Sequence, residues 1–101
     1  MTDLNVNDLN IIHNEKESRF EVTIDGQMAQ VAYMQAGNNV IFPHTEVPVE
    51  FEGKGIASKL AKASLDWAVE SGYKIQALCP FISAYIKRHE EYQPHTWGYK
   101  K

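Results

Sequence analysis

Two glycines precede a predicted helix in the segment Gly53-Lys54-Gly55-Ile56-Ala57. Glycines at such a junction let the backbone turn sharply and let a ligand approach it without meeting a Cβ atom. The first amides of a helix have no acceptor within the helix, and they carry the positive end of its dipole. The segment therefore has the composition of an anion site for phosphate or pyrophosphate, while a turn with no ligand remains the alternative interpretation.

The spacing of this glycine loop excludes two well-known nucleotide motifs. A Walker A loop requires Ser or Thr directly after Gly-Lys at the start of the helix, and Gly55 stands there instead. A dinucleotide fingerprint belongs to an early β-α unit, whereas three predicted antiparallel strands precede this loop.

His44 and Glu46 are candidate general bases. They lie two residues apart on a predicted strand, so their side chains face the same side. Histidine titrates near neutral pH, which suits the removal of a proton from an attacking group. A partly exposed polar pair with no catalytic role is the alternative. The four histidines show no His-x-x-x-His or Cys/His ligand spacing, so the sequence predicts no metal site.

Strands and helices must position these residues, and the spacing of apolar residues that predicts them changes near the middle of the chain. After a short apolar stretch at 10–14, the segments 19–24, 27–34 and 40–47 are the three predicted strands, with Asp25-Gly26 as a hairpin turn. After Pro48, apolar residues recur every three or four positions over 56–71, which predicts an amphipathic helix that ends at Gly72. A strand over 74–79 and a helix over 81–91, preceded by Pro80, complete the pattern.

This order predicts one α+β domain with a mixed α/β sheet, in which an antiparallel meander precedes a β-loop-α-β-α unit. The domain is expected to span residues 1–101, with a core at about 10–92 and an irregular tail at 93–101. The chain has 101 residues, of which 44% are hydrophobic, and this composition is typical of a single small globular domain.

Charge and cysteine content narrow the expected partners and compartment. The net charge of −3 gives no support for a nucleic-acid partner, which would normally require a basic face, and no apolar run is long enough to cross a membrane. The stretch Met1–Asn5 lacks the basic and apolar pattern of a signal peptide. His13 and His95 are expected at the surface. The single cysteine, Cys79, predicts a reducing, cytoplasmic environment.

Two longer blocks of sequence resemble the GCN5-related N-acetyltransferases, in particular the small single-domain members of that superfamily. The first block is His44–Ala57, HTEVPVEFEGKGIA, and the second comprises Cys79-Pro80-Phe81 and the segment Tyr85–His89, YIKRH. The likeness covers about residues 10 to 92, and the order of strands and helices agrees. The two blocks together are much more specific than the glycine loop alone.

The resemblance implies an acetyl-CoA-dependent N-acetyltransferase that acts on a primary amine of a small molecule or a protein. The strand through His44 would part from the strand that ends at Cys79, and the pantetheine arm of CoA would lie between them. It would bond the main chain near Val47 and Val49, and the Val47 amide would stabilise the oxyanion. The resemblance places the pyrophosphate on main-chain amides of Gly53, Lys54, Gly55, Ile56, Ala57 and Ser58.

The resemblance also suggests roles for Tyr85 and Cys79. Tyr85 stands where the superfamily often carries the general acid that protonates the CoA thiolate, and packing is its alternative role. Cys79 would end a strand beside the thioester, either as a nucleophile that takes the acetyl group or as a small packed residue. Glu50 and Glu52 depart from the family pattern, which has Gln or Arg there. Unless their carboxylates point away, they should weaken pyrophosphate binding, and Lys54, Lys59 or Lys62 would offset them.

Two other functions fit the same residues. One is a non-catalytic module that binds acyl-CoA, because the chain is shorter than most transferases of the superfamily. The other is an interaction domain in which the glycine turn is coincidental. An open edge of so short a sheet could also pair with a second copy of the chain.

Overall fold

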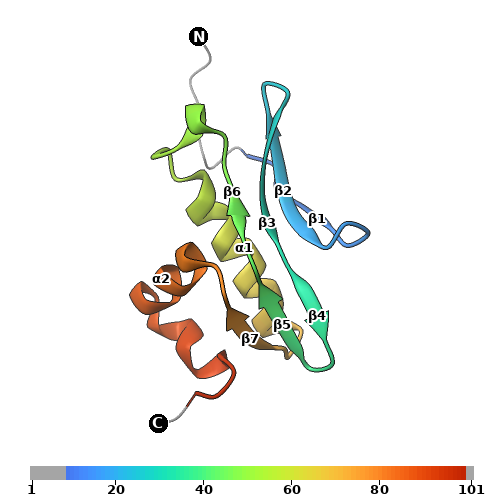
Figure 1. The fold of residues 1–101 in the computed structure, drawn as a ribbon, viewed down its shortest axis with the longest axis vertical. Coiled ribbons are helices and arrows are strands. Elements are labelled where there is room, and N and C mark those ends of the chain that lie inside the picture. The colour runs from blue at the N-terminus through green and yellow to red at the C-terminus, as the bar shows by residue number, and fades with distance from the viewer. Residues whose placement is uncertain (1–8, 100–101) are drawn as a thin grey trace.

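Strands and helices follow one another in the predicted order, with additional breaks. The computed structural model describes residues 9–99 (Figure 1). Its elements are β1 (Ile12–Asn14), β2 (Arg19–Ile24), β3 (Gln27–Ala32), β4 (Met34–Ala36), β5 (Asn39–Phe42), β6 (Thr45–Glu46), the 3-10 helix η2 (Val49–Phe51), α1 (Ile56–Glu70), β7 (Lys74–Ala77), α2 (Pro80–Arg88) and the 3-10 helix η3 (Glu90–His95).

The strands form two small sheets, and these confirm the predicted mixed α+β class. One sheet has the antiparallel order β1-β2-β3-β6, and the other has the order β4-β5-β7, in which β5 and β7 run parallel. The predicted hairpin turn at Asp25 and Gly26 joins β2 to β3, and both residues have positive φ, of 50° and 79°. A turn of this kind matches the twist of the strands that it joins.

Two predicted strands were wrong in their length, because each is interrupted. The strand predicted over 27–34 breaks at Tyr33, and the strand predicted over 40–47 breaks at Pro43 and His44. Proline has no N–H to donate to a strand ladder, which favours an interruption there. At each break the chain crosses from one sheet to the other. Two sheets therefore replace the simple meander that the sequence predicted.

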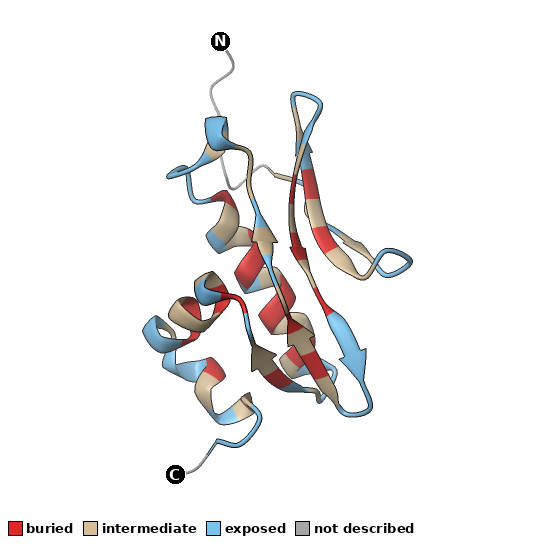
Figure 2. Ribbon diagram, viewed as in Figure 1, coloured by how far each residue is buried: buried red, intermediate tan, exposed pale blue. Residues whose placement is uncertain are grey.

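Helix α1 packs across one face of the strands, as Figure 1 shows. Its buried residues recur at helical spacing and include Ile56, Leu60 and Leu65, each at most 1% exposed. They meet the buried residues of β2, β3, β5 and β7, so one core cluster spans both halves of the sequence (Figure 2). This packing fixes the start of α1 relative to the strand ends.

The last part of the chain is more ordered than the sequence indicated. Helix α2 ends at Arg88, not at residue 91, and η3 follows it over Glu90–His95. The Trp97 N–H then donates to the Ile75 carbonyl at 2.8 Å, beside a parallel bridge between Ile75 and Thr96. The prediction of an irregular tail was therefore wrong for 93–97, because its backbone pairs with the outer edge of β7.

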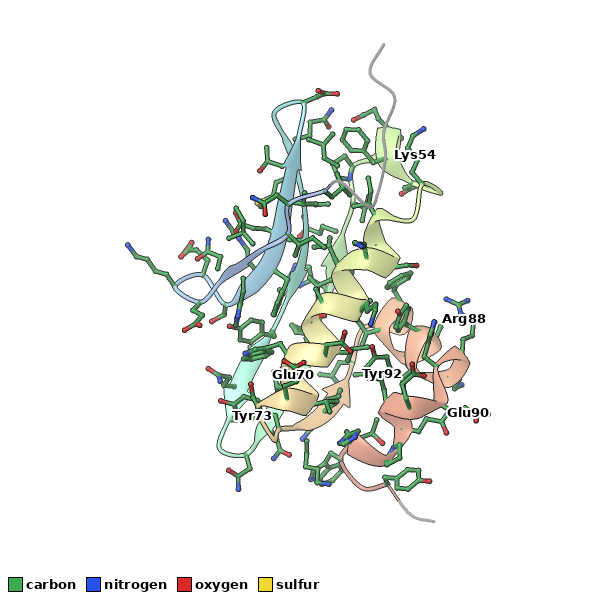
Figure 3. All side chains as sticks on the ribbon, turned by 180° about the vertical axis from the view of Figure 1, so that it is seen from behind. Lys54, Glu70, Tyr73, Arg88, Glu90 and Tyr92 are labelled. Carbon is green, nitrogen blue, oxygen red and sulfur yellow. The ribbon has the colours of Figure 1, made fainter. Side chains whose placement is uncertain are left out.

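Tyr92 anchors η3 to α1. Its hydroxyl donates to Asp66 at 2.6 Å, and Lys62 donates to the other oxygen of the same carboxylate at 2.9 Å. Figure 3 shows Tyr92 between the two helical segments. Burial of Tyr92 and its hydrogen bond to Asp66 raise the pKa of the phenol well above its ordinary value.

His13 is not the surface residue that the sequence suggested. Its ring stacks on Phe20 with centroids 4.1 Å apart and meets the edge of Trp67 at 4.7 Å. Its Nε2 atom forms a 2.6 Å hydrogen bond with the Tyr33 hydroxyl. Burial lowers the pKa of His13 below 6.5, and the nearby carboxylate of Glu15 opposes this effect in part.

We expect His13 to make the stability of the fold depend on pH. The unfolded chain binds a proton at His13 more readily than the folded chain, because the folded pKa is lower. The free energy of unfolding should therefore fall as the pH decreases from about 7 to about 5. Urea unfolding at both pH values measures this fall. A His13→Gln variant should show a smaller fall, and an equal fall in both proteins would contradict the prediction.

No helix within residues 9–99 is long and apolar enough to cross a membrane. The stretch Met1–Asn5, which was analysed for a signal peptide, lies outside the described residues.

Candidate functional site

A cavity of about 790 Å³ opens between β6 and the start of α1. The loop that carries η2 closes one side of it, and the hairpin between β2 and β3 reaches it from another. The lining residues are Gln27, Met28, Thr45, Glu46, Val47, Pro48, Phe51, Glu52, Gly53, Gly55, Ile56, Ala57, Ser58 and Phe81.

The glycine loop gives the cavity a set of free main-chain donors. Gly55 caps α1 with φ 83°, in the left-handed region, and no side chain caps the helix. The first amide of this helix that bonds is that of Lys59, which donates to the Gly55 carbonyl at 3.1 Å. Within residues 9–99, the amides of Ile56, Ala57 and Ser58 have no acceptor. These three donors and the positive end of the helix dipole suit an anion.

The neighbouring strands part beside this loop. β5 and β7 pair as far as Phe42 and Ala77, and the Phe42 carbonyl then accepts from the amides of both Leu78 and Cys79, at 3.1 and 2.9 Å. Beyond this point the chain leaves β7, and β6 pairs with β3. The strand through His44 and the strand that ends near Cys79 therefore stop pairing here, at the place where the sequence predicted that they part.

The register of β6 determines which of its amides bond to β3 and which point away from it. The Ala32 amide donates to the His44 carbonyl at 3.2 Å, so residues 44 and 46 form the bonded pairs with β3. Bonded and non-bonded pairs alternate along an antiparallel ladder. The amides of Thr45 and Val47 therefore point away from β3, and both residues line the cavity.

The structure brings most of the predicted binding residues together, but it leaves two outside. Val47, Gly53, Gly55, Ile56, Ala57 and Ser58 line the cavity. Val49 is 77% exposed and does not line it. Lys54 is also exposed and absent from the lining, and Figure 3 shows it on the outer side of the loop.

His44 and Glu46 form a pair, as their spacing predicted. The His44 Nε2 atom lies 3.0 Å from Glu46 Oε1, and both side chains are more than half exposed. Glu46 lines the cavity and His44 does not. An imidazole held by a carboxylate and open to solvent can take a proton from an amine that approaches from outside.

Cys79 is buried behind the cavity wall. Its side chain is 5% exposed and does not line the cavity, and its thiol donates to the Thr45 hydroxyl oxygen at 3.4 Å. Thr45 thus stands between the thiol and the cavity. The roles of Cys79 as a nucleophile or as a packed residue both stay predictions.

Tyr85 lies one turn of α2 beyond Phe81 and is absent from the cavity lining. It is 5% exposed, and its ring stacks on His89 with centroids 3.9 Å apart. Burial raises the pKa of its phenol, and the charges that act on it include those of Lys62 and Asp66 on α1. These contacts support a packing role for Tyr85, and its role as the general acid stays a prediction.

Sequence reasoning missed six lining residues: Gln27, Met28, Thr45, Pro48, Phe51 and Phe81. A signal existed for Thr45, because strand alternation puts its side chain on the same face as that of Val47, a predicted binding residue. No sequence pattern shows that the hairpin tip with Gln27 and Met28 reaches the start of α1.

The charges around the cavity are acidic. Glu46 and Glu52 line it, Glu50 does not, and no Lys or Arg of residues 9–99 is among the lining residues. The described part of the chain contains no group of three or more His, Cys, Asp or Glu side chains placed to hold a metal ion.

Comparisons with known proteins agree with this geometry. The family model described as GCN5-related N-acetyl-transferase matches residues 19–95. The chain is 36% identical to Protein NATD1 of Gallus gallus over 84 residues, which cover 80% of this chain and 76% of the relative. It is 34% identical to Protein NATD1 of Homo sapiens, covering 80% and 74%.

A solved structure shares the fold. A GCN5-like protein of Staphylococcus aureus, whose structure was determined by NMR in solution, superposes with a TM-score of 0.72 and 29% identity, covering 91% of both chains. The free amides at the start of α1, the parted strands and the family match over residues 19–95 agree with one another. The chain belongs to the GCN5-related N-acetyltransferase family.

Proposed function

We propose that this protein transfers the acetyl group of acetyl-CoA to a primary amine. The observation that carries the proposal is a single cavity that is lined both by β6 and by the start of α1, where three amides are free. The pyrophosphate of CoA would bond the amides of Ile56, Ala57 and Ser58. The pantetheine arm would run along β6 and bond the outward amide of Thr45, which leaves the Val47 amide for the carbonyl oxygen of the thioester.

The amine must lose a proton before it attacks, because its ordinary pKa is about 10.4. We assign this step to His44 with Glu46 as its partner, since the pair lies at the exposed rim of the cavity. The Val47 amide is the donor that would stabilise the oxyanion of the tetrahedral intermediate. The new nitrogen–carbon bond is complete in this intermediate, which collapses as the carbonyl re-forms, the carbon–sulfur bond breaks and CoA leaves as a thiolate.

A thermal-shift titration with acetyl-CoA tests binding. A ligand at about 100 times its dissociation constant should stabilise the fold by about 2.7 kcal/mol. Release of free CoA thiol in the presence of a panel of small amines and lysine-containing peptides then tests transfer. Saturable stabilisation without thiol release would indicate a non-catalytic acyl-CoA module, and the absence of stabilisation would contradict the proposal.

The pH–rate profile tests the assignment of the base. Loss of the His44 imidazole in a His44→Ala variant should lower the rate and change the shape of the profile, because the variant has no positioned proton acceptor for the amine. A profile with the same shape and height as that of the wild type would contradict the assignment.

Glu52→Gln is expected to tighten the binding of acetyl-CoA. Glu52 lines the cavity close to the amides of α1, so its charge repels the pyrophosphate. Removing one exposed charge should lower the dissociation constant about two- to fivefold, which corresponds to at most about 1 kcal/mol. Isothermal calorimetry at low salt measures the change, and added salt should reduce it.

Glu50→Gln is the matched control for this variant. Glu50 lies two residues earlier and does not line the cavity, so its replacement should alter the dissociation constant less. Equal effects of the two substitutions would mean that the overall charge of the chain matters, and not the place of Glu52.

A further inference from the structure

The Thr45 hydroxyl connects the cavity to the buried thiol of Cys79. Thr45 lines the cavity, and its oxygen accepts a hydrogen bond from Cys79 Sγ at 3.4 Å. In the ladder with β3, Thr45 stands opposite Val31, which is fully buried, so its side chain lies on the face of the sheet that meets the core. His44 and Glu46 turn to the other face.

A count of donors shows what Thr45 can offer to a ligand. A hydroxyl has one hydrogen to donate and two lone pairs that accept. The thiol of Cys79 occupies one lone pair, and within residues 9–99 the hydroxyl hydrogen has no acceptor. The other hydroxyl of the lining belongs to Ser58, in the first turn of α1. Thr45 is therefore the hydroxyl donor at the end of the cavity near Cys79.

We propose that Thr45 is a catalytic residue that donates a hydrogen bond to the sulfur of CoA as the thioester breaks. Cys79 is a positioning residue, because its thiol holds the Thr45 oxygen so that the hydroxyl hydrogen points into the cavity. This inference rests on the proposed transfer from acetyl-CoA. Thr45 would then act beside the leaving group, where the family resemblance suggested Tyr85. Tyr85 does not line the cavity.

The step balances without any further reactant. The carbon–sulfur bond breaks, its electron pair stays on sulfur, and the resulting thiolate accepts the hydrogen bond from Thr45. Thr45 keeps its proton, and Cys79 forms no bond to the acetyl group. The thiolate takes its proton later from water.

The ionisation of bound CoA tests this donor without any acceptor amine. The thiolate absorbance of the CoA complex is measured as a function of pH. The same curve for a complex with CoA that lacks its sulfur is subtracted, which removes the signal of Cys79. In a Thr45→Val variant, the acid dissociation constant of bound CoA should fall about tenfold, so its pKa rises. Thr45→Ser keeps the hydroxyl and should stay close to the wild type.

Thr23→Val is the matched control, because Thr23 is exposed on β2 and outside the cavity lining. Thermal unfolding of each variant shows whether it is folded, and Thr45→Ser provides a second variant if Thr45→Val is not. Absence of CoA binding in the wild type would overturn the proposed function. Normal binding with the same CoA pKa in the wild type and in Thr45→Val would overturn this inference alone.

Replacements of Cys79 separate positioning from covalent catalysis. Cys79→Ser retains a donor to Thr45 and should leave the pKa of bound CoA near that of the wild type, whereas Cys79→Ala should raise it. An acetyl group found on Cys79 by mass spectrometry and passed on to an amine would overturn the positioning role. Equal CoA titrations in Cys79→Ser and Cys79→Ala would also overturn it.

Discussion

A Gly55→Val variant is expected to bind acetyl-CoA at least about 100-fold more weakly than the wild type, which corresponds to losing about two hydrogen bonds to a charged group. Gly55 has φ 83° and precedes the three free amides of α1. A β-branched residue strains this conformation, and its side chain would stand where a pyrophosphate approaches the backbone. Isothermal calorimetry with acetyl-CoA measures the change in affinity.

Gly72→Val provides a matched control for this prediction. Gly72 follows the other end of α1, with φ 81°, and a Cβ atom there would have open space around it. Its replacement should cause a similar backbone strain, and therefore a similar loss of stability, while it leaves the affinity for acetyl-CoA unchanged. If both variants lost affinity equally, the effect would come from the strain in α1 and not from the anion site.

Phe42→Ala is expected to lower the free energy of unfolding by about 3–5 kcal/mol. The Phe42 side chain is fully buried in β5, and its ring lies 6.5 Å from that of Tyr33. Its removal leaves a cavity at the last pair of the ladder between β5 and β7. Small domains have a total stability of about 5–15 kcal/mol, so this change removes a large share of it. Urea unfolding measures the difference.

Tyr99→Ala is the control for this substitution, because it removes an aromatic ring that is 44% exposed. It should change the stability by no more than about 0.5 kcal/mol. A loss below about 1 kcal/mol in Phe42→Ala would show that the neighbouring side chains refill the space, contrary to the prediction.

The start of α1 and its glycine loop could be predicted from the sequence because their causes are local. The change of apolar spacing after Pro48 and the two glycines determine where a helix begins and which of its amides stay free. The hairpin at Asp25-Gly26 is local in the same way, because both residues must adopt positive φ. The family blocks around the loop and around Cys79 added the order of strands and helices along the chain, which the structure confirms.

Tertiary structure alone decided which side chains meet at the cavity. The tip of the β2–β3 hairpin reaches the start of α1 through long-range strand pairing, so no local pattern indicates that Gln27 and Met28 line the site. The same packing buries Cys79 behind Thr45 and leaves Tyr85 outside the lining. A sequence determines which groups are present and the local backbone that carries them. Contacts between distant segments decide their neighbours, because those contacts depend on how the whole core packs.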